Sequence, residues 1–167
     1  MADRIEMKSQ RAGKEIPIHL CPISRYDGEI GDMALCVFTV LSYITTDEEM
    51  GKSIAVIADK LKTGGLLFVD LPQDAFFHTG IIMDKKDQNF KRYVTLYPNE
   101  NGLYEYKESC SGICDGMNFE YEDHFPLRKW QWREIDEYLI RAGMQLIPKD
   151  FQQFGWTGSA YRMYRKG

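Results

Sequence analysis

Hydrophobic positions between residues 33 and 72 follow a strand, helix, strand order. Residues 33–41 are a nearly unbroken apolar run, which is typical of a parallel strand covered on both faces and placed centrally in a sheet. Thr46 and Glu49 form a capping box before apolar residues at helical spacing, and this helix is expected to continue to Gly64 and Gly65. Residues 66–72 form a second apolar strand. The order predicts a right-handed parallel crossover.

Weaker patterns flank this unit. Residues 1–12 place apolar side chains on one helical face, and Gly13 can end that helix in the left-handed conformation. Residues 16–20 alternate as a strand, and Pro17 favours an edge position because it has no N–H to donate. These patterns predict a short helix and an edge strand.

After residue 72 the pattern changes to short alternating runs separated by turn signals, at residues 93–97, 103–107 and 118–121. Such runs predict an antiparallel meander. Apolar residues at helical spacing over 132–142 then predict a helix, followed by strands at 144–147 and 159–164.

Composition limits the class of protein without naming a function. The 167 residues are 44% hydrophobic and 28% charged, which suits one soluble domain. A net charge of -4 with no block of like charge argues against nucleic acid or an acidic membrane surface as a partner. No apolar run approaches the ~20 residues of a membrane span, and the N-terminus lacks the apolar stretch of a secretory signal. We therefore expect a cytoplasmic protein with reduced cysteines.

Three ordered motifs resemble class I S-adenosylmethionine-dependent methyltransferases. Residues 31–44, in which Asp32 opens the apolar run and Ser42-Tyr43 follows it, resemble the fourth strand of that family. Residues 61–71 are similar to its Leu-Lys-Pro-Gly-Gly turn and fifth strand, with Thr63 in place of proline. Residues 127–130, 134–135 and 142–144 resemble its late Arg-x-Trp, Glu-Ile and Ala-Gly pattern. The resemblance covers roughly residues 15–165.

This resemblance implies an α/β fold with a truncated Rossmann-like sheet, in which central parallel strands and an antiparallel C-terminal hairpin are joined by an antiparallel meander. The family's strand order is 3-2-1-4-5-7-6, and its cofactor lies over the ends of strands 1, 2 and 4. Residues 16–20 would be strand 3. We expect a single domain over 1–167, with 1–72 as the remnant of the cofactor half, 73–126 as an acceptor-side lid and 127–167 as the helix and final strands.

Two cofactor-binding features of the family have no counterpart before residue 16. The family's first strand carries a glycine-rich turn, and its second strand ends in an acid that binds the ribose. The glycines of residues 28–31 are neither preceded by a buried strand nor followed by a helix, so they do not match that turn. Residues 21–24 also lack the acid that the family places near adenine. The resemblance thus implies S-adenosylmethionine binding only if another chain completes the site.

Candidate ligand-binding residues lie where the two apolar strands end. Thr39, Ser42 and Tyr43 are at the carboxyl end of the first strand, where open α/β sheets place ligands, although packing explains them equally well. Asp70 ends the second strand, where it can hold a substrate amine or hydroxyl or fix a turn. Arg128 can bind an anionic substrate or stack on a neighbouring indole. We predict these five residues as substrate-binding candidates and no catalytic side chain.

A metal site is not expected. Cys110 and Cys114 with His124 nearby suggest zinc, but no second Cys or His pair is present to complete four ligands. His78 has no identifiable partner and is interpreted as a loop residue.

The sequence leaves three functions open. The first is a methyltransferase-like protein with a small-molecule acceptor, unable to bind cofactor or act alone. The second is a non-catalytic dimeric binding or assembly module with an aromatic surface on its meander, formed by Tyr93, Tyr97, Tyr104, Tyr106 and Tyr121. The third is a gene fragment without selected activity, or an excerpt of a longer enzyme. Loss of strands 1 and 2 would bare the edge of the most apolar strand, so we expect a homo-oligomer through that edge, or its cover by residues 1–20.

Overall fold

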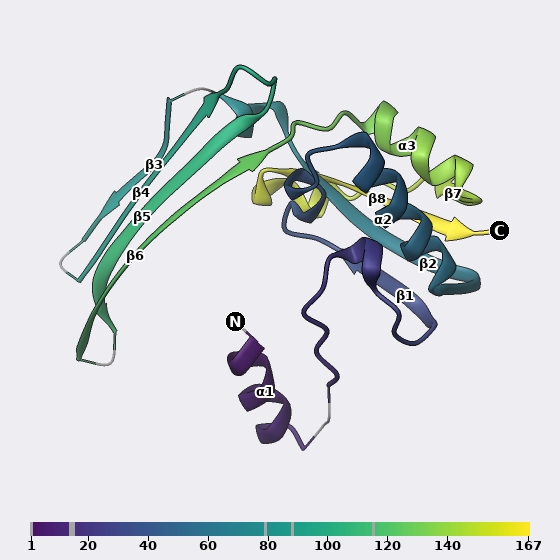
Figure 1. Ribbon diagram of the computed structural model, residues 1–167, viewed down its shortest axis with the longest axis horizontal. Helices are drawn as coiled ribbons and strands as arrows, with labels where there is room; N and C mark the ends of the chain where they lie inside the picture. Colours follow the sequence, from purple (N-terminus) through teal and green to yellow (C-terminus); the bar gives the residue numbers. More distant parts are fainter. Residues whose placement is uncertain (1, 14–15, 79, 88, 115) are drawn as a thin grey trace.

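The computed structural model describes residues 2–13, 16–78, 80–87, 89–114 and 116–167. Two four-stranded sheets organise the described residues (Figure 1). The first has the order β1-β2-β8-β7, and the second, the meander, has the order β3-β4-β5-β6. The strands of the first sheet are β1 (Gly31–Cys36), β2 (Leu61–Pro72), β7 (Met144–Ile147) and β8 (Ser159–Lys166). Those of the meander are β3 (Gly80–Lys86), β4 (Phe90–Pro98), β5 (Tyr104–Cys114) and β6 (Met117–Leu127).

The helices are α1 (Ala2–Arg11), α2 (Asp47–Asp59) and α3 (Trp132–Arg141), and the longest 3-10 turns are η2 (Val40–Tyr43), η3 (Asp74–Phe77) and η4 (Gln152–Thr157). Figure 1 shows α2 and α3 side by side over the first sheet, with α1 set apart from both sheets. Among the described residues, no helix has the length and apolarity needed to cross a bilayer.

The first sheet confirms the predicted parallel crossover and antiparallel C-terminal strands. β1 pairs parallel with β2, whereas β8 pairs antiparallel with both β2 and β7. Its core joins β2 to α2 and α3 through buried side chains that include Leu67, Val69, Ile54, Ile135 and Leu139. The predicted α/β class with a truncated Rossmann-like sheet is therefore correct.

The N-terminal helix also matches its prediction, since α1 is followed by Gly13 at a φ of 62°. Met1 lies outside the described residues.

The predicted strand at residues 16–20 is wrong. These residues form no ladder, and the described backbone of β1 pairs only with β2. One backbone contact explains part of their course, because the Ile16 amide donates to Ser9 Oγ at 3.1 Å. β1 is consequently an edge strand and not a central one. The expected cover of β1 by a strand from residues 1–20 does not occur in the described residues.

β1 is shorter than the predicted apolar strand of residues 33–41. Phe38 and Thr39 take φ angles of 66° and 61°, in the left-handed region that L-residues rarely adopt. These two residues turn the chain into η2 immediately after the strand. The apolar run therefore serves two elements, a strand and a turn.

The crossover helix ends earlier than predicted. α2 begins at the expected cap, where Thr46 Oγ1 accepts from the Glu49 amide at 3.2 Å, but it ends at Asp59 and not at Gly64. Leu61 already pairs with Gly31, and Gly64 occupies a bulge at a φ of 79°. A buried Leu61 that fits the helical spacing belongs instead to β2.

The meander contains one strand more than the sequence predicted, and its strands are longer. β3, which ends in Asp84, Lys85 and Lys86, was missed because its last three residues are charged and break the alternation. β5 and β6 pair without interruption from Tyr104 and Leu127 to their common hairpin. In Figure 1 the meander extends as a curved arm from the carboxyl end of β2.

Candidate functional site

All five predicted site residues converge on η2, the turn that follows β1. Thr39, Ser42 and Tyr43 belong to the turn or cap it, Asp70 contacts it from β2, and Arg128 contacts it from the end of β6. The carboxyl ends of two parallel strands and the base of the meander therefore meet at one place.

Asp70 holds the left-handed turn. Its carboxylate is fully buried, and both oxygens accept from the Thr39 amide, at 2.9 and 3.2 Å. Burial, and next the charge of Asp70, raise the pKa of the adjacent Cys36 thiol to about 12, so that thiol stays protonated. Of the two roles that the sequence left open for Asp70, the geometry shows the turn-fixing contact.

Ser42 and Arg128 connect the turn to the meander. The Arg128 amide donates to the Ser42 carbonyl at 2.8 Å, and Ser42 Oγ is buried without a hydrogen-bond partner among the described residues. The Arg128 guanidinium stacks on Trp130 at 3.5 Å from the ring centroid and pairs with Asp47 and Glu134, at 3.2 and 3.1 Å. The indole stack considered from the sequence is thus present.

Tyr43 links η2 to an aromatic row on the meander. Its ring lies 5.0 Å from that of Phe125, which stacks on Tyr106 at 4.7 Å. The face of the meander that makes these contacts is called the inner face below. Burial, followed by the negative charges of Asp123 and Glu108, raises the pKa of Tyr43.

A charge cluster centred on the buried Glu108 lies on the inner face, and the sequence did not predict it. Glu108 accepts hydrogen bonds from Arg92 Nε at 2.6 Å, from the Tyr106 hydroxyl at 2.6 Å and from the Tyr121 hydroxyl at 2.7 Å. The hydrogen bond from Arg92 is the main cause that lowers the pKa of Glu108 to about 2. Charged residues occupy adjacent positions on β4 and on β5, as at Lys91 and Arg92, so the sequence pattern did not show which of them faces inward.

The pleat divides the meander's tyrosines between two faces. Tyr104, Tyr106 and Tyr121 share the inner face with Glu108, whereas Tyr93 and Tyr97 pair in register with Ser109 and Glu105 on the other side. The prediction that these five tyrosines form a single aromatic surface is therefore wrong.

The remaining chemistry-bearing residues do not join the site. Cys110 is buried and Cys114 exposed, and His124 Nε2 lies 2.8 Å from Glu105 Oε2. In the part of the chain that the structure describes, no three His, Cys, Asp or Glu side chains are arranged to hold a metal ion. His78 is exposed directly after η3.

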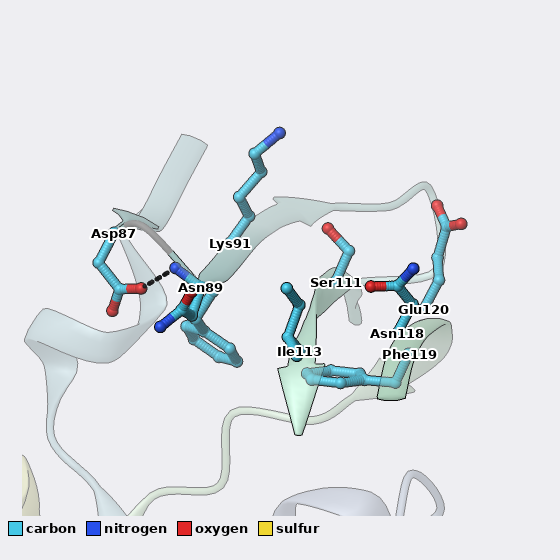
Figure 2. Close-up of a pocket in the computed structure, with 10 residues that line it drawn as sticks. Asp87, Asn89, Lys91, Ser111, Ile113, Asn118, Phe119 and Glu120 are labelled. Atoms are coloured by element: carbon cyan, nitrogen blue, oxygen red, sulfur yellow. Dashed lines mark hydrogen bonds between the residues drawn. The ribbon is translucent and has the colours of Figure 1, made fainter. Parts of the chain in front are cut away.

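A cavity of about 430 Å³ lies at the far tip of the meander, away from η2. Figure 2 shows Phe119 and Ile113 on its wall and the hydrogen bond from the Asn89 amide to Asp87, which is 2.9 Å long. Gly112 leaves no room for a side chain there, since a Cβ would lie 2.4 Å from the Asn89 carbonyl oxygen. None of the five predicted residues lines this cavity.

Solved structures share this fold. An S-adenosylmethionine-dependent methyltransferase from Clostridium acetobutylicum matches with a TM-score of 0.82 and 16% identity, over 97% of this chain and 69% of that one. The fold is that of a class I S-adenosylmethionine-dependent methyltransferase. DesVI from Streptomyces venezuelae matches with a TM-score of 0.76 and 16% identity, over 100% of this chain and 72% of its own.

A third structure, an amino pentose methyltransferase from Micromonospora echinaspora with S-adenosylmethionine bound, matches this methyltransferase-like fold with a TM-score of 0.72 and 17% identity, over 100% of this chain and 71% of that one. No family model and no curated protein sequence matches the chain. At these identities the likeness establishes the fold. In the methyltransferase-like sheet, the observed order β1-β2-β8-β7 corresponds to strands 4-5-7-6, as the resemblance implied.

Proposed function

We propose that this chain carries the acceptor side of an enzyme that transfers a methyl group from S-adenosylmethionine to a small molecule. The contact between Tyr43 of η2 and Phe125 of the meander carries the proposal. Open α/β sheets bind their ligands at the carboxyl ends of the strands, and this contact sets the inner face of the meander beside that edge. A neighbour described as an amino pentose methyltransferase supports a small-molecule acceptor.

The cofactor is bound, in this proposal, only when another chain completes its site. Two backbone groups of this chain at the end of β1 are already engaged, because the Thr39 amide donates to Asp70 and the Ser42 carbonyl accepts from Arg128. Residues 27–30 lead into a strand and not into a helix, so they do not form an N-terminal amide cradle. These described residues alone do not fit S-adenosylmethionine, and methyl transfer depends on orienting donor and acceptor together.

A second copy of this chain, docked along β1, is the partner that we propose. Leu35 and Met33 point to the same face of β1, and both are exposed, Leu35 by 64%. A cavity of about 510 Å³ lies beside this strand, lined by Met33, Ile57 of α2 and Pro17. A two-fold related copy presents the same edge, so antiparallel pairing of the two β1 strands would satisfy both edges at once.

The unpaired edge equally favours a second function, a non-catalytic dimeric assembly module. An assembly module would associate through β1 in the same way, but it would bind no cofactor in any state of assembly. Cofactor titration at two protein concentrations separates the two functions.

Leu35→Lys is expected to weaken self-association at least about tenfold, because a lysine on an edge strand opposes pairing with another strand. A tenfold change corresponds to about 1.4 kcal/mol of association free energy. Light scattering measures the association, and isothermal titration with S-adenosylmethionine at dilute and concentrated protein measures the binding. The proposed function predicts cofactor binding by the associated form of the parent chain and its loss in Leu35→Lys.

Ile140→Lys is the matched control, since Ile140 is an aliphatic side chain on α3 with 62% exposure. It should leave association and binding unchanged. Equal cofactor binding by dilute monomer and concentrated oligomer would contradict completion by a second copy. Association without any binding would favour the assembly module.

A further inference from the structure

Asp123 stands beside the aromatic row of the inner face. It is opposite Glu108 in the β5–β6 register, and Phe125 follows it by two residues. Residues two apart on a strand point to the same face about 7 Å apart. Because Phe125 contacts Tyr43, the carboxylate of Asp123 belongs to the face that meets η2.

The two carboxylates of this cross-strand pair are compensated differently. Glu108 is buried and pairs with Arg92, with 2.6 Å between Arg92 Nε and the carboxylate. Asp123 is exposed and accepts from the neighbouring His124 amide at 3.0 Å. Across the described chain, no Lys, Arg or His side chain forms an ion pair with Asp123. Like charges directly opposite each other on a sheet are unfavourable, so a cation at Asp123 would relieve this pair.

An exposed tyrosine lies on each side of Asp123 along the inner face, since Tyr121 precedes it by two residues and Tyr43 contacts Phe125, which follows it by two. Tyr43 is 52% exposed, and Tyr121, two residues before Asp123 on the same face, is 46% exposed. The negative charge also acts on Tyr43, whose pKa is raised by burial and then by Asp123 and Glu108. A carboxylate flanked by aromatic rings favours an organic cation over a neutral or anionic group, because the ring quadrupole and the carboxylate both attract it.

We propose that Asp123, together with the rings of Tyr43 and Tyr121, binds the ammonium group of a small molecule. We identify this molecule as the methyl acceptor, and that identification alone rests on the proposed function. Binding of the cation itself requires no cofactor, so it is measured on the chain alone.

Choline is the probe, and 3,3-dimethylbutan-1-ol, of the same shape without the charge, is its control. NMR of the aromatic ring protons follows each titration. Choline is expected to bind saturably and at least about tenfold more tightly than the neutral alcohol, with shifts at Tyr43, Tyr121 and Phe125. Equal binding of the two compounds, no binding of either, or shifts confined to residues of the opposite face would overturn the inference.

Asp123→Asn is expected to weaken choline binding between about threefold and tenfold while leaving the alcohol unchanged. Glu122→Gln removes an adjacent exposed carboxylate that points to the opposite face, and should have no effect. Tyr43→Ala tests the ring independently and should also weaken choline binding. Equal effects of the two carboxylate variants would sink the site. Choline binding without cofactor binding by the associated form would keep this inference and reject the methyltransferase proposal, whereas the reverse result would reject the ammonium site alone.

Discussion

Glu108→Ala is expected to lower the free energy of unfolding by about 3 kcal/mol, one of the two largest effects that we predict. The variant removes the acceptor of hydrogen bonds from Arg92, Tyr106 and Tyr121 and leaves the guanidinium without its carboxylate. Breaking a buried ion pair by removing one partner costs about 3–5 kcal/mol, and the partial exposure of Arg92 favours the lower end. Urea unfolding measures the loss.

Glu122→Ala is the matched control, because Glu122 is an exposed glutamate on the neighbouring strand. Its free energy of unfolding should stay within about 0.5 kcal/mol of the parent value. A loss in Glu108→Ala that is as small as the loss in Glu122→Ala would show that the cluster does not stabilise the meander.

The Glu108 carboxylate should make the free energy of unfolding depend on pH in the acidic range. The folded-state pKa of Glu108 is lowered to about 2, below the unfolded value of about 4.3. The contribution of Glu108 is therefore complete above the unfolded pKa and is lost as the pH falls from about 4.3 through about 2. Urea unfolding at several pH values should show a smaller acid-induced loss in Glu108→Ala than in the parent chain.

Asp70→Ala is expected to cost about 2 kcal/mol and to loosen η2. Hydrogen bonds to a charged group contribute about 1.5–3 kcal/mol, and the variant leaves the Thr39 amide without its acceptor next to two residues of positive φ. Urea unfolding gives the energy, and hydrogen exchange of the Thr39 and Ser42 amides reports on the turn.

Asp74→Ala is the control for Asp70, since Asp74 is an exposed aspartate that pairs with Lys129 at 2.9 Å. Exposed pairs contribute about 0–1 kcal/mol, so its effect should be small and should not reach η2. Unchanged exchange at Thr39 in Asp70→Ala would contradict the role of Asp70 in holding the turn.

Local patterns determined much of the first sheet. The N-cap at Thr46 depends on a hydrogen bond between near neighbours, and the apolar run of β2 and the helical spacing of α3 report burial that nearby residues decide. The order of these elements was enough to indicate the methyltransferase-like sheet, because a parallel crossover followed by an antiparallel C-terminal pair permits few topologies.

The ends of several helices and strands could not be predicted from the sequence, because contacts between residues far apart in the chain decide them. The apolar run after Cys36 could not show that Asp70, 31 residues away from Thr39, captures an amide and turns the chain. Leu61 fits a helix and a strand equally well, and its pairing with Gly31 assigns it to β2. Residues 16–20 alternate like a strand but have no partner ladder in the described structure.

The candidate site divides in the same way. The sequence alone predicted the five candidate residues near the carboxyl ends of the strands, since their positions follow from the order of the helices and strands. Only the tertiary structure decided that they meet at η2, that Arg128 stacks on Trp130, and that the meander's pleat turns Glu108 inward. Strand register sets which of two faces each side chain occupies, and register depends on partners that the linear sequence does not name.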